Sequence, residues 1–120
     1  MKVERVGFFR ELRHGDPNGE SLKNIINNCA KADENKIIDY LKSGVVWVAC
    51  GGATSDVLNP SNGIIGPPDI LTDGSWVWPA DLIYYVQQYH ITLDENFINH
   101  IIKNNWLISR DEINLDNLEF

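Results

Sequence analysis

Apolar and polar residues are most regularly spaced in the stretch 70–90, which predicts a strand, a turn, a second strand and a helix in that order. Asp73-Gly74 separates two apolar runs, and glycine tolerates the positive φ that a tight hairpin turn requires. Trp76 and Trp78 are two positions apart, so both indoles share one face of the second strand. Pro79 ends that strand and can begin a helix, where its missing N–H costs nothing. The apolar stripe of that helix is Leu82, Tyr85, Val86 and Tyr89.

Three further apolar stripes predict helices elsewhere in the chain. The first begins after Ser21, which can act as its N-cap, and the second runs from about Asp33 to Ser43. The third begins at a capping box over Thr92–Glu95, in which the threonine hydroxyl and the glutamate carboxylate satisfy two free backbone amides. Together with the helix after Pro79, these stripes predict about four helices.

The remaining elements are strand-like. Val45–Cys50 is short and apolar at every position, which is typical of a strand buried on both faces, so we expect it to be the central strand, with Trp47 in the core. The tail from Arg110 to Phe120 alternates acidic and apolar residues and predicts either a terminal edge strand with an acidic face or a frayed end. The expected fold is one α+β domain over residues 1–120: a central, mostly antiparallel sheet containing Val45–Cys50 and the 70–78 hairpin, with about four helices packed on it.

The composition bears on the size of the core and on the cellular location of the protein. The chain has 120 residues, of which 43% are hydrophobic, so it can bury a real core. Its first residues mix charges with apolar side chains, unlike a signal peptide, and no apolar run approaches the length of a membrane span. Cys29 and Cys50 make one disulfide possible but form no secreted disulfide framework. We therefore expect a cytoplasmic protein with no membrane partner.

The acidic excess lies entirely in the second half of the chain. Residues 1–60 hold eight basic and eight acidic residues, whereas residues 61–120 hold two basic and nine acidic ones. Such a field repels phosphate backbones and attracts basic partners, which disfavours nucleic-acid binding. The alternative is that the acidic surface only keeps the protein soluble. The one basic cluster, Arg10, Arg13 and His14, is expected to pair with these acids rather than to bind an anion.

Searches for catalytic and metal-binding motifs give negative expectations. Gly51-Gly52 follows an apolar strand as a phosphate loop would, but no lysine follows at the required spacing, so a tight turn is expected. His90 and His100 have no Cys or carboxylate at ligand spacing, and we expect neither a metal site nor a cofactor. A nucleophilic triad around Cys50 can be written only formally. No catalytic residue is predicted.

Several blocks, spread over nearly the whole chain, resemble a family of small uncharacterised bacterial proteins. The blocks are Phe8-Phe9-Arg10-Glu11-Leu12-Arg13-His14-Gly15, Tyr40-Leu41-Lys42-Ser43-Gly44, Thr72-Asp73-Gly74-Ser75-Trp76-Val77-Trp78-Pro79, Asp81-Leu82, and Tyr84-Tyr85 to Tyr89-His90. Such proteins are similar to the immunity proteins of polymorphic-toxin and contact-dependent inhibition systems, which bind and neutralise a cognate toxin domain in the cytoplasm. The resemblance transfers no functional residue, because the shared blocks are mostly structural.

Three functional hypotheses follow. The leading one is an immunity protein, not an enzyme, that blocks a cationic toxin of nuclease type through acidic residues of its second half. The second is a small enzyme or ligand-binding protein that uses the Gly51–Gly63 loop. The third is an interaction module that reads a partner through Trp76 and Trp78, should that face be open rather than core. The predicted toxin-binding residues of the leading hypothesis are Asp111, Glu112, Asp116 and Glu119, with Asp94 and Glu95 as neighbours.

Overall fold

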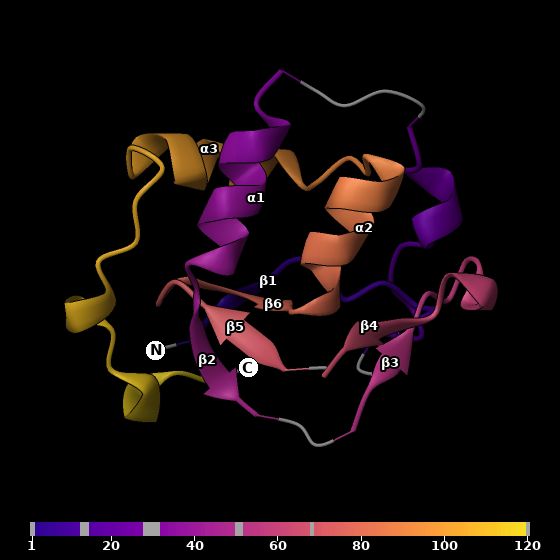
Figure 1. Cartoon of the computed structure of the whole chain (residues 1–120). Coiled ribbons are helices and arrows are strands. Elements are labelled where there is room, and N and C mark those ends of the chain that lie inside the picture. The colour runs from indigo at the N-terminus through magenta and orange to yellow at the C-terminus, as the bar shows by residue number, and fades with distance from the viewer. Residues whose placement is uncertain (1, 13–14, 28–31, 50–51, 68, 120) are drawn as a thin grey trace.

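The computed structural model describes residues 2–12, 15–27, 32–49, 52–67 and 69–119. They form a four-stranded sheet in the order β1-β6-β5-β2, beside a two-stranded sheet of β3 and β4 (Figure 1). The first and sixth strands pair in parallel, and every other pair is antiparallel. The strands are β1 (Glu4–Arg5), β2 (Val45–Val48), β3 (Thr54–Ser55), β4 (Ile64–Gly66), β5 (Ile70–Thr72) and β6 (Trp76–Pro79).

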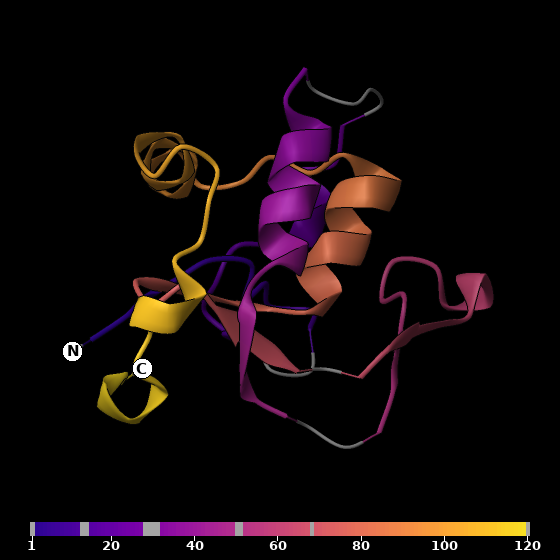
Figure 2. The same cartoon turned by 60° about the vertical axis from the view of Figure 1, so that its left-hand side comes forward.

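Three α-helices lie on one side of the four-stranded sheet (Figures 1 and 2). They are α1 (Glu34–Lys42), α2 (Asp81–Tyr89) and α3 (Glu95–Lys103). Short 3-10 turns complete the regular structure, namely η1 (Leu22–Asn24), η2 (Pro60–Asn62), η3 (Arg110–Glu112) and η4 (Leu115–Asn117). Within the part of the chain that is described, the α+β class and the mostly antiparallel sheet are therefore confirmed, but there are three helices rather than about four.

The helix expected after Ser21 is the missing one. Ser21 does act as an N-cap, but it caps only the single turn η1. The backbone beyond this turn bonds across the fold instead of along a helix. The Asn27 amide donates to the Tyr89 carbonyl at 3.1 Å, and the Ile25 carbonyl accepts from the Thr92 amide at 3.1 Å. Cys29, the last residue of the predicted stripe, lies outside the described residues.

The prediction that Val45–Cys50 is the central strand is wrong. Among the described strands, β2 pairs with β5 alone and forms one edge of the sheet. Val46 and Val48 keep 46% and 38% of their surface exposed, and Trp47 is half-buried. An apolar run shows that a strand can be buried. The position of that strand in the sheet depends instead on which strands the helices cover. Strands β5 and β6 take the central positions, and Cys50 lies outside the described residues.

The core is built on the inner face of the central hairpin. Trp78 is fully buried and Trp76 is 8% exposed, and both rings contact Phe97 of α3, at centroid distances of 5.6 and 5.2 Å. The Trp78 indole N–H donates to the Leu41 carbonyl at the end of α1. Because these aromatic side chains interlock in the core, the hypothesis of an open recognition face at Trp76 and Trp78 is wrong.

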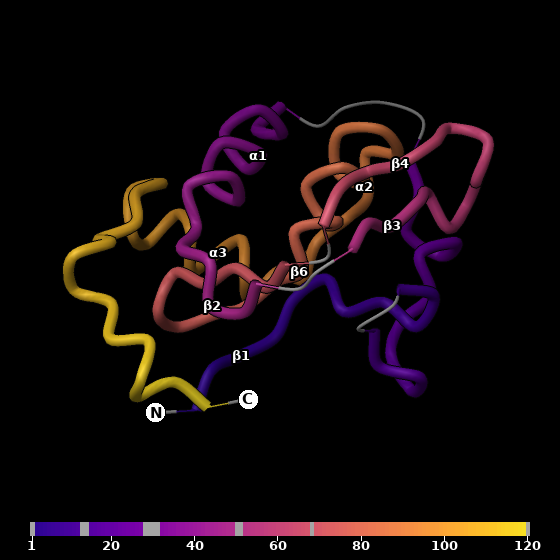
Figure 3. Tube along the Cα trace, turned by 60° about the horizontal axis from the view of Figure 1, so that its bottom comes forward, coloured from indigo at the N-terminus to yellow at the C-terminus, as the bar shows by residue number. Residues whose placement is uncertain are grey.

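The two ends of the chain meet beside β1. Helix α3 begins after Asp94 rather than after Thr92, and Asp94 caps it by accepting from the Asn96 amide at 2.8 Å. The Thr92 hydroxyl accepts from the side-chain amide of Asn27. After α3 the tail makes the two turns η3 and η4, so it is neither an edge strand nor a frayed end. It finishes in one parallel bridge between Lys2 and Glu119 (Figure 3).

Among the described residues, no helix is both long and apolar enough to cross a membrane.

Candidate functional site

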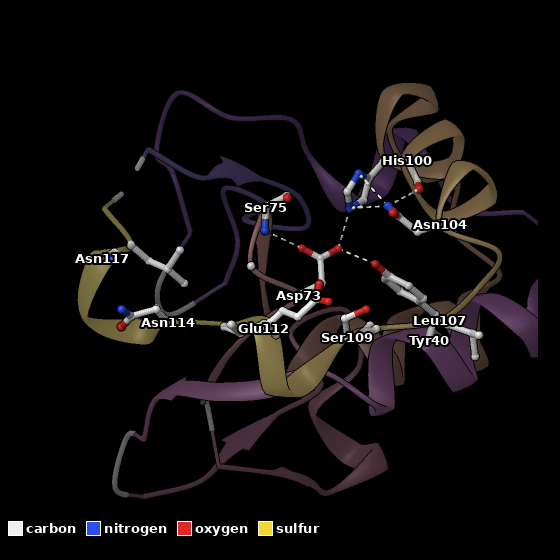
Figure 4. A pocket seen from close by; sticks show the side chains of 14 residues that line it. Tyr40, Asp73, Ser75, His100, Asn104, Leu107, Ser109, Glu112, Asn114 and Asn117 are labelled. Carbon is white, nitrogen blue, oxygen red and sulfur yellow. Dashed lines mark hydrogen bonds and ion pairs between the residues drawn. The ribbon is translucent and has the colours of Figure 1, made fainter.

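A cavity of about 390 Å³ lies between the tip of the β5–β6 hairpin, α1, α3 and the tail (Figure 4). We name it the hairpin pocket. The segment after α3, residues 104–118, supplies more than half of the lining residues, so the pocket exists because this segment, with its turns η3 and η4, returns across the hairpin. The pocket is lined by Tyr40, Asp73, Gly74, Ser75, His100, Asn104, Leu107, Ile108, Ser109, Glu112, Ile113, Asn114, Asn117 and Leu118.

Asp73 links the hairpin to two helices. One carboxylate oxygen, Oδ1, accepts from the backbone amides of Ser75 and Trp76 at 2.9 and 2.7 Å, which shapes the turn. The other, Oδ2, accepts from the Tyr40 hydroxyl at 2.5 Å and pairs with His100 Nε2 at 2.9 Å. The side chain is only 2% exposed. Its four bonds use the full accepting capacity of a carboxylate, so Asp73 is a structural centre rather than an open ligand-binding group.

The two side chains on Asp73 Oδ2 are held in defined states. Burial, followed by the hydrogen bond and negative charge of Asp73, raises the pKa of Tyr40 far above its usual range, so its hydroxyl stays protonated and donates. Because Asp73 accepts from His100 Nε2, that nitrogen carries the proton when the ring is neutral. Asn104 lies next to the ring, with its amide nitrogen 2.9 Å from the His100 carbonyl oxygen.

Part of the pocket lining is apolar. Leu107 lines the pocket although it is 71% exposed, and Ile108, Ile113 and Leu118 also line it. Ile113 packs on the turn so closely that a β-carbon at Gly74 would lie 3.3 Å from its Cγ1 atom. Gly74 also has a φ of +98°, which L side chains rarely adopt. The tail and the hairpin tip are thus fitted to each other.

The pocket lining contains two carboxylates and no lysine or arginine, and its histidine, His100, is paired with Asp73. Asp73 and Glu112 both line the cavity, and the side chain of Asp73 is buried whereas Glu112 is exposed. Among the described residues, the Glu112 carboxylate forms no hydrogen bond or ion pair, and in the view of Figure 4 it extends toward Asp73. Because Asp73 already has its hydrogen-bond partners, Glu112 is the carboxylate of the lining that is left to attract a positively charged group.

The residues predicted from the sequence divide between two places. Asp111, Glu112, Asp116 and Glu119 are all exposed and follow one another along the tail. Of these, only Glu112 lines the hairpin pocket. Asp94 and Glu95 are also exposed but stand at the start of α3, where Asp94 lines a separate hollow with Arg5, Asp16 and Glu20. The hairpin pocket therefore does not include Asp94 and Glu95.

Sequence reasoning did not identify Tyr40, Asp73 and His100 as one group. The sequence predicts Asp73 as a turn residue, and the structure shows that its side chain is also buried. Its partners are 33 and 27 residues away along the chain. No local spacing links such residues. An aspartate in a hairpin turn commonly accepts hydrogen bonds from the turn amides. That local role is sufficient to explain Asp73 in the sequence, so it gives no sign of the contacts with Tyr40 and His100.

A second buried carboxylate, Asp56, fixes the loop that the enzyme hypothesis would use. It is fully buried and accepts from the hydroxyls of Tyr84 and Tyr89, at 2.9 and 2.5 Å, and from the side-chain amide of Asn62 at 3.0 Å. It also accepts from two amides of its own loop. These contacts join the β3–β4 arm to α2 and account for Asp56 structurally. Gly51 and Cys50, at the start of this loop, lie outside the described residues.

We expect Asp56→Asn to remove part of the acid sensitivity of folding. Burial alone would raise the pKa of Asp56, but hydrogen bonds from Tyr89, Asn62, the Asn59 amide and Tyr84 hold it below its ordinary value of 3.8. A carboxylate with a lowered pKa stabilises the fold fully above its unfolded pKa and loses that contribution as the pH falls through the folded pKa. The wild type should therefore lose more stability than the variant below about pH 4, as measured by urea unfolding at several pH values.

At neutral pH the same substitution should lower the free energy of unfolding by about 1–3 kcal/mol, because a carboxylate acceptor becomes a partly donating amide. Raised pKa values of Tyr84 and Tyr89, the latter to about 12, keep both hydroxyls donating throughout this experiment. If the free energy of unfolding fell equally with pH in the variant and the wild type, the lowered pKa assigned to Asp56 would be contradicted.

The two described histidines are each used in one pair. His100 contacts Asp73, and His90, which ends α2 with a left-handed φ of 51°, contacts Glu34 at 2.9 Å. In the part of the chain that the structure describes, no group of three or more His, Cys, Asp or Glu side chains is placed to hold a metal ion. Arg10 donates from its Nε to the Gly19 carbonyl, while Arg13 and His14 of the predicted basic cluster lie outside the described residues.

No protein-family model, curated protein or solved structure matches this chain. The resemblance to immunity proteins stays a prediction from the quoted sequence blocks.

Proposed function

We propose that this protein is an immunity protein that binds a cognate cationic toxin domain of nuclease type in the cytoplasm and neutralises it. The observation that carries the proposal is the acidic tail around the hairpin pocket. The segment after α3 brings exposed carboxylates and the exposed Leu107 to a cavity whose lining contains no lysine or arginine. An apolar centre with a charged rim is the usual composition of a specific protein interface.

The charge of the chain supports a basic partner. The net charge is −7, and residues 61–120 hold nine acidic residues against two basic ones. Opposite charges speed the encounter of two proteins, and carboxylates can occupy the site where a nuclease would hold phosphates. The exposed residues of the tail are available for this purpose because none of Asp111, Glu112, Asp116 and Glu119 is buried in the core.

The proposal predicts a tight and salt-sensitive complex with the toxin domain encoded directly upstream of this chain. We expect the affinity to fall by at least about tenfold when sodium chloride is raised from about 50 to about 500 mM, because salt screens exposed charge pairs. Isothermal titration calorimetry with the purified domain measures this, and an activity assay of the toxin tests neutralisation. No complex, or a complex without inhibition, would reject the function.

A further inference from the structure

We propose that the hairpin pocket receives an arginine side chain of the bound protein. This inference rests on the proposed function for the source of the arginine, while the pocket chemistry can be tested on the chain alone. The guanidinium group would lie under Glu112, above the buried Asp73, with its methylene stem along Leu107.

The requirement for a cation comes from the charges that face the cavity. Asp73 has its four acceptor positions filled by hydrogen bonds, so it contributes negative potential without binding a ligand directly. Among the described residues, the exposed Glu112 forms no hydrogen bond or ion pair, so it is the carboxylate that can contact a ligand. The other titratable groups in the lining are His100 and Tyr40, and both are engaged with Asp73.

The polar lining favours a guanidinium over an ammonium group. Arginine has five N–H donors in a fixed plane and needs several acceptors around it, whereas lysine concentrates its charge on one strongly hydrated nitrogen. The pocket brings a carboxylate at Glu112, a hydroxyl at Ser109 and an amide oxygen at Asn104 around one cavity. Glu112 belongs to η3, Ser109 directly precedes that turn and Asn104 is the C-cap of α3, so the three groups can approach a planar ligand from different sides (Figure 4).

The apolar wall favours a side chain that enters from a protein surface. Leu107 and Ile113 line the pocket, and Leu107 remains 71% exposed. The methylene stem of arginine can cover such a surface while its head group reaches the polar lining. The cavity volume of about 390 Å³ is within the range of sites that bind small ligands and is ample for one side chain.

The test uses matched probes on the isolated protein. N-acetyl-arginine amide carries the guanidinium group, and N-acetyl-citrulline amide has nearly the same shape without the charge. Nuclear magnetic resonance titration at low salt should show weak, saturable shifts with the arginine probe, centred on Asn104, Ser109 and Glu112. The citrulline probe should shift these signals at least about fivefold less at equal concentration, since a charge-assisted bond is lost.

Glu112→Gln should weaken the binding of N-acetyl-arginine amide by about three- to tenfold. The effect is modest because solvent screens an exposed carboxylate. The control is Glu20→Gln, which makes the same chemical change at an exposed residue outside the hairpin pocket and should leave the titration unchanged. Dispersed spectra of both variants verify that they fold.

Several results would overturn the proposal. Equal shifts with the arginine and citrulline probes would show that the charge of the probe does not matter. Equal weakening of arginine-probe binding by Glu112→Gln and Glu20→Gln would show that the probe does not bind in the hairpin pocket. Stronger binding of N-acetyl-lysine amide would reject arginine, and stronger binding of free arginine would reject a partner's side chain as the source. Probe binding in the pocket together with no toxin complex would reject the proposed function but leave the cation site, so the two failures are distinguishable.

Discussion

Replacing Asp73 with alanine is expected to lower the free energy of unfolding by about 3–5 kcal/mol, the largest stability effect of the substitutions considered for this protein. The substitution removes the acceptor of four hydrogen bonds at once. It leaves the buried Tyr40 hydroxyl without its partner and frees the turn amides of Ser75 and Trp76. Each buried donor that loses its acceptor costs its own desolvation penalty, so the effect exceeds that of a single lost bond.

Urea unfolding followed by tryptophan fluorescence measures this change, because Trp76 and Trp78 adjoin the hairpin turn and are buried. Asp73→Asn should cost less, because an amide oxygen can still accept from the two turn amides. The control Asp39→Ala removes an exposed carboxylate from α1 and should change stability by less than about 0.5 kcal/mol. A loss at Asp73→Ala no greater than that of the control would contradict the assigned role of Asp73.

Reversing two charges in the tail is expected to have the largest effect on binding. Asp111→Lys combined with Glu112→Lys should weaken the toxin complex about 100-fold at low salt, because two attractive contacts become repulsive ones. Because these charges are exposed, most of the loss in affinity should come from a slower association rate. Surface plasmon resonance at two salt concentrations separates the association and dissociation rates.

The matched control reverses two acidic residues elsewhere, Glu20→Lys with Asp39→Lys. Both residues are exposed, and the control alters the net charge by the same amount as the tail variant. It should weaken the complex by less than about tenfold, through the long-range field alone. Equal losses in the two double variants would mean that net charge, and not the tail, determines binding.

Local patterns were sufficient to predict most of the helices and the hairpin. Helix α1 begins and ends within a residue of the predicted limits, with Ile37, Ile38 and Leu41 buried as its stripe requires. The Asp73-Gly74 turn, the strand with Trp76 and Trp78, and the helix after Pro79 all occur in the predicted order. These features follow from spacings of a few residues, which the sequence displays directly.

The predictions from the sequence are wrong where a distant segment of the chain forms the hydrogen bonds that a local element was expected to form. The predicted helix after Ser21 stops after one turn because the backbone at Ile25 and Asn27 bonds to the segment after α2. Thr92 was a sound capping residue by sequence, but its hydroxyl accepts from Asn27 and Asp94 takes its place. In both cases a tertiary hydrogen bond replaced a local one of similar strength.

The sequence by itself determined that this is one α+β chain with an acidic second half, and it pointed to the tail that carries Glu112. It could not place β2 at the edge of the sheet or bring Tyr40, Asp73 and His100 onto one carboxylate. Hydrophobic periodicity and charge are properties of each segment, whereas strand order and buried hydrogen bonds depend on which segments pack together. The tertiary structure alone therefore decided that the acidic tail closes a pocket over a hairpin turn.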